Sequence, residues 1–229
     1  MTGPGGSDGV VESDEAASGE AFLRALGDDA AQLHPEIAAQ MRTSSARTRG
    51  EGVFVRAGSR YRLLNALLLP LLGRDAVVTR IGRDVPFSVR TESAVRTATV
   101  GGATIERATL RTVREFRFPT GTQRVADVIT TSVHPGLVRT LLGERGRIEL
   151  IEECTVGAGG TLRMRTRRAA LRLGGRRFAL RGVLAVHADV EDGWDDDNAR
   201  RTIAVTVRNP IAGTILEYRG WYRMLAEDQ

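Results

Sequence analysis

Three charged residues stand where the alternation of apolar and polar side chains predicts an inward-facing position. Arg114 and Asp127 lie on two segments of a predicted hairpin, and Glu152 lies between Leu150 and Cys154 in a later segment. Buried polar groups need a partner or a ligand, because burial without one is costly. Arg114 would then anchor an anionic headgroup in a pocket, or Asp127 or Glu152 would act as an acid or base. A plain ion pair with a hydrogen-bonded glutamate is the structural alternative.

A run of arginines between Arg163 and Arg181 is the clearest charge feature, and the chain contains no lysine. Its alternation is typical of the solvated outer face of a sheet. The alternative is an anion-binding surface for phosphate, lipid headgroups or nucleic acid, with Arg163, Arg165 and Arg167 as candidates. Only 5% of the residues are aromatic. Bases stack on aromatic side chains, so we do not expect nucleic acid as a partner.

Other motifs predict no cofactor, metal or catalytic site. The glycines of 157–160 precede a strand, whereas a dinucleotide-binding loop precedes a helix. Asp195 to Asp197 are contiguous, whereas a calcium loop needs alternating ligands. The three histidines are isolated from other ligands. Cys154 falls on a predicted core face and is expected to act as a small apolar residue.

The elements that position these residues are predicted to be antiparallel strands, since the apolar period is two from about Val85 onward. Segment 111–118 is predicted to turn at 119–122 and to return over 123–132. Matching apolar to apolar side chains pairs Phe116 with Val125, which sets Arg114 opposite Asp127.

Two later hairpins indicate a strongly curved sheet. A three-residue loop at Ala158 to Gly160 pairs Val156 with Leu162 and Cys154 with Met164. Gly174 and Gly175 form a turn that pairs Leu171 with Phe178. The parity of apolar residues changes near Arg167 and Arg168, which predicts a β-bulge there and places Met164 opposite Leu184. Bulges bend strands, so this part of the sheet should curve sharply.

The N-terminal third is predicted to contain a tail, short helices and a linker. Residues 1–19 are expected to form a disordered tail, and one helix should begin at Glu20 and another after His34. Residues 43–52 are expected to be a polar linker. The apolar segment from Tyr61 to Leu72 is expected to be a helix, either buried on the sheet or covering an apolar cavity or touching a membrane surface.

The fold class that follows is α+β, mainly antiparallel β. We expect a single domain over 20–229, in which one curved meander sheet resembles a half-barrel and the helices pack on it. The chain has 229 residues, a net charge of +5 and one cysteine. It shows no apolar run long enough to span a bilayer and no secretory signal, so we expect a cytoplasmic protein.

Several short motifs resemble an uncharacterised bacterial family, domain of unknown function 4166. The motifs are Leu33-His34-Pro35, Gly50-Glu51-Gly52, Arg114-Glu115-Phe116, Asn209-Pro210 with Gly213, and Tyr218-Arg219-Gly220-Trp221. Their order and spacing cover about Phe22 to Met224. The resemblance implies no known activity and no catalytic residue. Members of this kind can occur joined to NAD(P)-binding domains similar to saccharopine dehydrogenase, so it implies a separate NAD(P)-binding redox protein as a partner.

The leading functional hypothesis is a non-enzymatic binding or accessory domain whose concave sheet receives an apolar or amphipathic small molecule. It depends on the inferred curvature, the apolar segment and the inward charges at Arg114, Asp127 and Glu152. An enzyme that uses Asp127 or Glu152 as acid or base is one alternative. A surface that binds anions through its arginines is the other.

Overall fold

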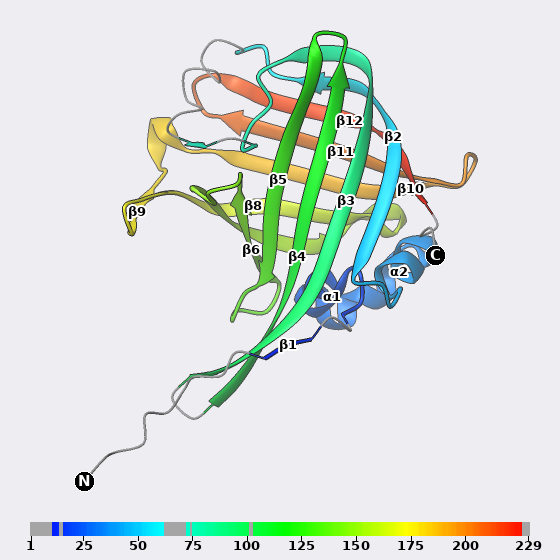
Figure 1. The fold of residues 1–229 in the computed structure, drawn as a ribbon, viewed down its shortest axis with the longest axis vertical. Coiled ribbons are helices and arrows are strands. Elements are labelled where there is room, and N and C mark those ends of the chain that lie inside the picture. Colours follow the sequence, from blue (N-terminus) through cyan, green and yellow to red (C-terminus); the bar gives the residue numbers. More distant parts are fainter. Residues whose placement is uncertain (1–10, 14–15, 62–71, 74, 101–102, 226–229) are drawn as a thin grey trace.

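The structure is a computed structural model that describes residues 11–13, 16–61, 72–73, 75–100 and 103–225. Its architecture is a closed antiparallel barrel with short helices at one end (Figure 1). The helices are α1 (Glu20–Leu26), α2 (Pro35–Met41) and the 3-10 turns η1 (Gly27–Gln32), η2 (Ala158–Gly160) and η3 (Gly182–Leu184). The strands are β1 (Val11–Ser13), β2 (Arg47–Gly58), β3 (Ile81–Val100), β4 (Ala103–Phe118), β5 (Gly121–Thr131), β6 (Leu137–Leu142), β7 (Ile148–Val156), β8 (Leu162–Leu173), β9 (Arg176–Ala179), β10 (His187–Asp195), β11 (Arg200–Asn209) and β12 (Gly213–Leu225).

The barrel closes because β3 pairs with two neighbours. It joins β2 on one side and β4 on the other, so the order β3-β2-β12-β11-β10-β8-β7-β6-β5-β4 returns to β3 as a ring of ten strands. Strands β1 and β9 lie off this ring, paired with β3 and β8. The predicted half-barrel is therefore wrong about closure, since the sheet closes completely, but the antiparallel class and the strong curvature are confirmed.

The prediction missed β2, the strand that closes the ring, because its glycines suggest a linker. Gly52 pairs with Tyr222 of β12, and a Cβ on Gly52 would lie 1.9 Å from the Trp221 carbonyl oxygen. A Cβ on Gly220 would lie 2.0 Å from the Val53 carbonyl oxygen, next to a register shift between Arg219 and Gly220. Only glycine permits such close approach of two backbones, so residues 47–52 form a strand and not a linker.

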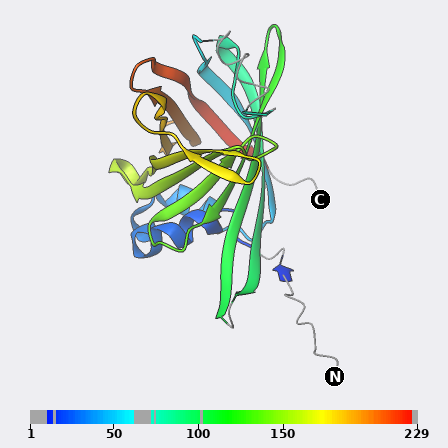
Figure 2. The same ribbon diagram turned by 90° about the vertical axis from the view of Figure 1, so that its left-hand side faces the viewer.

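The helices close one end of the barrel and do not lie along a concave sheet (Figure 2). Pro35 occupies the first turn of α2, and the backbone N–H of Glu36 donates to Nδ1 of His34. Ile37 and Met41 share the buried face of this helix, as predicted. They belong to one apolar cluster with residues of α1, β4, β5, β6, β7 and β8. The end of the barrel is therefore sealed by side chains from both helices.

A second apolar cluster fills the middle of the barrel with aromatic rings. Phe54 stacks on Phe87 with ring centroids 3.8 Å apart, and on Phe116 at 5.0 Å. Tyr218 packs edge-on against Phe54 at 5.0 Å. These rings come from β2, β3, β4 and β12, so they bind the closing strands to the rest of the barrel.

The two predicted registers nearest to β8 are confirmed. Val156 pairs with Leu162 and Cys154 with Met164, across a loop in which Gly160 has a φ of 71°. The register shifts where Ile151 pairs with Arg168 and Glu152 with Thr166, which leaves Arg167 as the extra residue of the predicted bulge. Leu171 pairs with Phe178 across the Gly174–Gly175 turn, as predicted.

Two other predicted registers are wrong. Phe116 pairs with Gln123 and not with Val125, because Phe118 pairs with Gly121 across a tight turn at Pro119 and Thr120. Met164 pairs with Val190 and not with Leu184. The 3-10 turn η3 ends the β8–β9 hairpin early, so the returning chain meets β8 several residues later.

Two predicted segments fall largely outside the described residues. The apolar helix expected over Tyr61 to Leu72 covers 62–71, which the structure does not describe. The disordered tail expected over 1–19 stays a prediction for 1–10 and 14–15. In the described residues 16–19, Ala16 is buried and the Ser18 hydroxyl donates to the Gln40 carbonyl oxygen. No helix in the described ranges is long and apolar enough to cross a bilayer.

Candidate functional site

The interior of the barrel holds the Arg114–Asp127 ion pair that the sequence predicted, reached through a different register. Arg114 pairs with Val125 and Thr112 with Asp127, so the two charged side chains are diagonal neighbours on β4 and β5. Side chains at such diagonal positions are still within reach when one of them is long. The Arg114 Nη1 donates to Asp127 Oδ2. Burial lowers the pKa of Arg114, but attraction to Asp127, Tyr218 and Tyr222 together with the hydrogen bond to Asp127 raises it overall, so the guanidinium stays charged.

This ion pair is incomplete. Asp127 Oδ1 is buried and has no hydrogen-bond partner among the described residues. Nη1 is the Arg114 atom that contacts Asp127, and the other N–H groups of its guanidinium have no partner in the part of the chain that the structure describes. The side chains are 17% and 6% exposed, so neither group is fully hydrated. Unsatisfied polar atoms of this kind mark a position where a ligand or water belongs.

Glu152 lies on the inward face of β7 and is 2% exposed. The Thr140 hydroxyl of β6 donates to its Oε2. Burial raises the pKa of Glu152 to about 7, and repulsion from Asp127 adds to the rise, although the hydrogen bond from Thr140 opposes it. The carboxyl is therefore close to half-protonated at neutral pH, inside the barrel that also holds Arg114 and Asp127.

A second charged cluster inside the barrel was missed by the sequence analysis. Arg201 of β11 donates from Nε to Asp192 Oδ1 at 3.1 Å and from Nη2 to Oδ2 at 2.6 Å. The Tyr222 hydroxyl donates to Asp192 Oδ2 at 3.2 Å, and Arg201 Nη1 lies 3.4 Å from Gln40 Oε1. Arg201 shares its parity with Ile203 and Val205, so extending the apolar alternation by two residues would have placed it inside.

A cavity of about 110 Å³ lies between these charges and the helices. Its polar wall contains the charged or phenolic side chains of Arg114, Asp192, Arg201 and Tyr222, together with Ser18, Gln40, Thr48, Thr91 and Thr112. The apolar wall comes from β3, β4, β5, β8, β10 and the helices, and includes Phe22, Met41, Phe87, Val89, Leu110, Ile129, Leu162, Met164 and Val190. Cavities of comparable size with apolar linings bind molecules as small as benzene. Asp127 and Glu152 are absent from the described lining.

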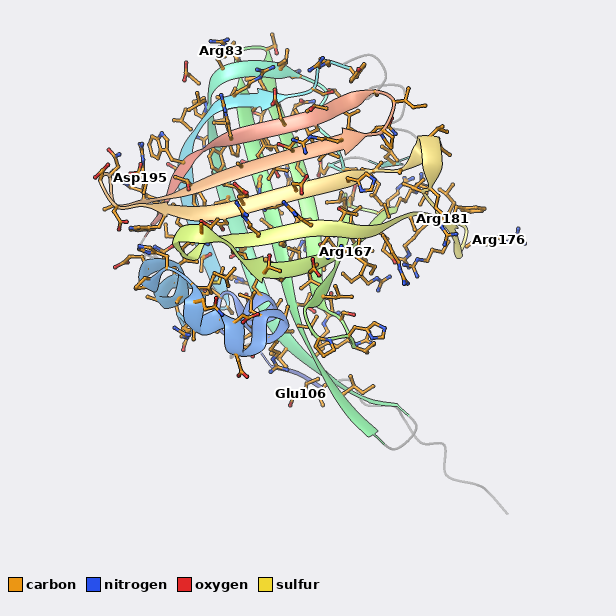
Figure 3. The ribbon with its side chains drawn as sticks, turned by 180° about the vertical axis from the view of Figure 1, so that it is seen from behind. Arg83, Glu106, Arg167, Arg176, Arg181 and Asp195 are labelled. Atoms are coloured by element: carbon orange, nitrogen blue, oxygen red, sulfur yellow. The ribbon has the colours of Figure 1, made fainter. Side chains whose placement is uncertain are left out.

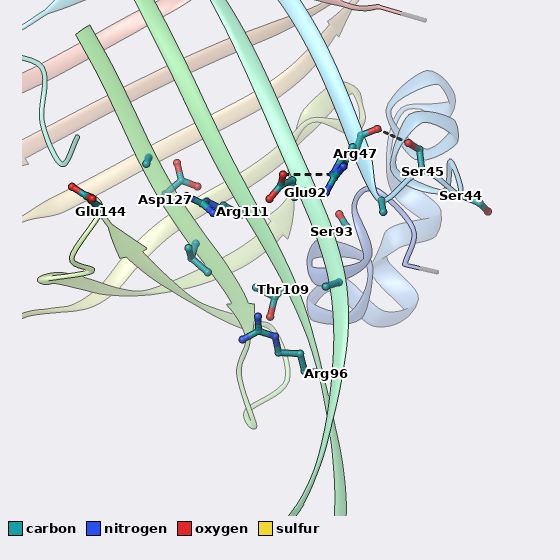
Figure 4. Close-up of a pocket in the computed structure, with 15 residues that line it drawn as sticks. Ser44, Ser45, Arg47, Glu92, Ser93, Arg96, Thr109, Arg111, Asp127 and Glu144 are labelled. Atoms are coloured by element: carbon teal, nitrogen blue, oxygen red, sulfur yellow. Dashed lines mark hydrogen bonds and ion pairs between the residues drawn. The ribbon is translucent and has the colours of Figure 1, made fainter. Parts of the chain in front are cut away.

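A larger recess of about 900 Å³ lies outside the barrel wall over β3, β4 and β5 (Figure 4). Its lining is polar, and Arg47 Nε lies 3.6 Å from Glu92 Oε1 within it. Asp127 belongs to this lining, whereas Arg114 belongs to the lining of the internal cavity. The Arg114–Asp127 ion pair therefore lies between the outer recess and the inner cavity.

Comparison with known families decides which family the chain belongs to. The family model described as "Domain of unknown function (DUF4166)" matches residues 33–222. The chain belongs to this family. The match spans helix α2, nine strands of the barrel and β12 as far as Tyr222, and so includes both buried ion pairs. No curated protein and no solved structure matches the chain.

The arginines that the sequence proposed as an anion surface of this DUF4166 domain each contact a carboxylate. Arg163 Nη2 lies 2.8 Å from Glu191 Oε1, and Arg165 Nε lies 3.2 Å from Asp189 Oδ1. Arg167 Nη2 donates to Glu153. A fourth carboxylate, Glu149, is 3% exposed and is contacted by arginines that include Arg139 at 3.0 Å, Arg172 at 3.7 Å and Arg177. The charge of the run is thus partly balanced on the outer face of the sheet.

Proposed function

We propose that this DUF4166 domain is a binding domain that holds a small, largely apolar molecule with an oxygen acceptor inside its barrel. The observation that carries the proposal is the position of Arg114, a guanidinium on the wall of an otherwise mainly apolar cavity whose side chain is 17% exposed and which contacts Asp127 through one nitrogen. Ligand pockets combine apolar walls with a few polar groups that fix orientation. Arg114 would fix such a ligand by its oxygen.

The ligand should be neutral. Asp127 already balances the charge of Arg114, and Asp192 balances that of Arg201. An anionic ligand would add a buried charge without a counter-ion, which costs free energy. A ketone, amide or ester oxygen accepts from a guanidinium without that cost. The ligand that we propose is therefore uncharged, whereas the sequence hypothesis considered a ligand with an anionic headgroup.

We expect a ligand to reach the cavity through the wall that helices α1 and α2 form. Phe22, Gln40 and Met41 line the cavity, and α1 and α2 are only seven residues each. Short helices joined to the rest of the chain by a few hydrogen bonds open locally more easily than a continuously hydrogen-bonded barrel. We expect the ligand to enter by displacement of this helical cap.

Cyclohexanone and cyclohexane together test the proposal. Both have a ring suited to a cavity of about 110 Å³, and only the ketone has an acceptor for Arg114. Binding to the native state raises the free energy of unfolding by mass action, so the ketone should raise the melting temperature more than cyclohexane does. Native mass spectrometry of the freshly purified protein gives an independent look for a bound small molecule.

Arg114→Met should remove the difference between the two probes. Arg107→Met is the matched control, because Arg107 is exposed on the same strand and its loss should leave the difference intact. Equal stabilisation by both probes would show that Arg114 is no anchor. The absence of any shift would reject binding inside the barrel.

Catalysis by Glu152 has one observation in its favour, a pKa of about 7. Against it stands the burial of the carboxyl, which is 2% exposed and absent from the described linings of both the cavity and the recess. A catalytic acid or base must reach its substrate within hydrogen-bond distance. We therefore propose binding and not a reaction.

A further inference from the structure

Strands β8 and β10 pair over only part of their lengths and then diverge at one corner of the barrel wall. Strand β10 pairs with β8 from Leu162 to Arg165, and beyond this β8 continues with β9 as its partner. Between the two diverging parts lies a pocket of about 290 Å³. Its lining includes Arg168, Arg177, Arg181 and His187 together with Leu180 and Val186. The corner is therefore a pocket lined by both basic and apolar side chains, some of them from β9.

Exposed apolar side chains gather beside this pocket. Val183 and Leu184 of η3 are 62% and 64% exposed, and Ile211 is 73% exposed. Asn209 Nδ2 donates to the Val183 carbonyl oxygen at 2.8 Å, which holds the β11–β12 turn that carries Ile211 against η3. We call Val183, Leu184 and Ile211 the apolar tip. Contiguous exposed apolar groups of this kind mark an interaction surface.

The charges at this corner have one sign. The chain from Leu162 to Val186 holds eight arginines and no acidic residue. Several of these arginines contact carboxylates, but Arg168, Arg176 and Arg181 are exposed and have no ion-pair partner among the described residues. Figure 3 shows Arg176 and Arg181 at the same edge of the molecule. These three form the free arginines of the corner.

We propose that this corner docks on an anionic lipid surface. The apolar tip enters the boundary between headgroups and acyl chains, and Arg168, Arg176 and Arg181 contact the phosphates. Anchoring to a bilayer needs both contributions, since an apolar group or a basic patch alone binds weakly. Charge complementarity selects the anionic lipid, because the corner offers several unbalanced guanidinium groups and these pair with phosphates in a bidentate manner. The proposal is independent of the ligand proposed for the barrel interior.

Vesicle co-sedimentation of the full chain tests the docking. We expect binding to vesicles of phosphatidylcholine mixed with phosphatidylglycerol, little binding to phosphatidylcholine alone, and weaker binding as salt is added. Arg176→Gln with Arg181→Gln should weaken binding by about fivefold for each arginine, which corresponds to about 1 kcal/mol each. Val183→Ser with Leu184→Ser should weaken it by at least about tenfold. All four positions are exposed, so circular dichroism should show an unchanged fold.

The matched controls make the same kinds of substitution, Arg to Gln and an apolar residue to Ser, at positions outside the free arginines and the apolar tip. Arg163→Gln with Arg165→Gln removes two arginines that contact carboxylates. Val133→Ser removes a side chain that is 67% exposed near α1, where Gly136 donates to the Ala25 carbonyl oxygen. Both controls should bind as the unchanged protein does.

Four results would overturn the proposal. They are failure to bind phosphatidylglycerol vesicles, equal loss in the control variants, release by free inorganic phosphate at the concentration of the lipid phosphate, and dimerisation that the tip variants abolish. Release by free phosphate would leave only an anion pocket. Dimerisation would make the corner an interface between two copies of the chain.

Discussion

Two arginine–aspartate pairs lie inside the same barrel, and they are built differently. Arg201 donates hydrogen bonds to Asp192 from two nitrogens, and the Tyr222 hydroxyl donates a further one to the same carboxylate. Arg114 contacts Asp127 through one nitrogen and leaves Asp127 Oδ1 without a partner. A fully satisfied network rigidifies a core, whereas a partly satisfied one carries a continuing cost. We therefore expect a structural role for the first pair, and the ligand site that we propose at the second pair depends on this difference.

The largest expected effect is on the complete pair. Arg201→Met should lower the free energy of unfolding by about 3–5 kcal/mol, because it leaves Asp192 buried without its partner. Urea denaturation measures the loss. Adding Asp192→Leu should recover most of it, since the unpaired charge is then gone. If the single variant is as stable as the unchanged protein, the distinction between the two pairs fails.

The next effect concerns Glu152 and pH. Its pKa of about 7 in the folded protein lies above the ordinary value of 4.5, so the folded state binds this proton more tightly than the unfolded chain does. The contribution of Glu152 to stability is therefore greatest below about pH 4.5 and decreases until about pH 7. Glu152→Gln keeps an acceptor for Thr140 and should gain about 2 kcal/mol at about pH 8, with no such decrease.

Urea denaturation at acidic and alkaline pH checks this prediction. Glu153→Gln is the control, because Glu153 faces outward on the same strand and its side chain is 34% exposed. A pH dependence that persists in Glu152→Gln would show that another group carries it. The incomplete pair would then lack the neighbouring half-protonated carboxyl that distinguishes it from the complete one.

A smaller effect is expected at the incomplete pair itself. Arg114→Met should cost about 1–2 kcal/mol, less than Arg201→Met, because it breaks one hydrogen bond to Asp127 whereas Arg201→Met breaks two to Asp192. The same urea denaturation compares the two variants directly. A loss as large as that of Arg201→Met, recovered by Asp127→Leu, would make the Arg114 pair structural and remove the main support for a ligand site.

The smallest effect sharpens the role of the complete network. Tyr222→Phe removes the hydrogen bond to Asp192 but retains the ring in the aromatic core, so it should cost about 1 kcal/mol. Burial raises the pKa of the Tyr222 hydroxyl well above its ordinary value, so the bond stays intact across neutral and mildly alkaline pH. A cost that grows between neutral and mildly alkaline pH would contradict that assignment.

Local signals in the sequence were enough for the elements that turn tightly. Gly174 with Gly175, the loop ending at Gly160 and the parity change at Arg167 placed the β7, β8 and β9 registers correctly, because turn geometry and pleat are short-range properties. Inward parity also placed Arg114, Asp127 and Glu152 inside. The Arg114–Asp127 contact was correct even though its register was shifted by two residues, since that shift keeps both side chains on the same face.

Three features depended on packing between different strands. In the sequence the glycines of β2 suggest a linker. In the structure they pair with β12, and the two backbones lie too close for a Cβ at Gly52. The cluster of Asp192, Arg201 and Tyr222 takes one side chain from each of three neighbouring strands, β10, β11 and β12, so it emerges only when the packing of all three is known. Unused donors and an orphan oxygen are properties of packing, which no single segment contains. The sequence by itself therefore determined the strand class, the family and the inward charges, and only the tertiary structure decided closure, the cavity and which charged pair is left incomplete.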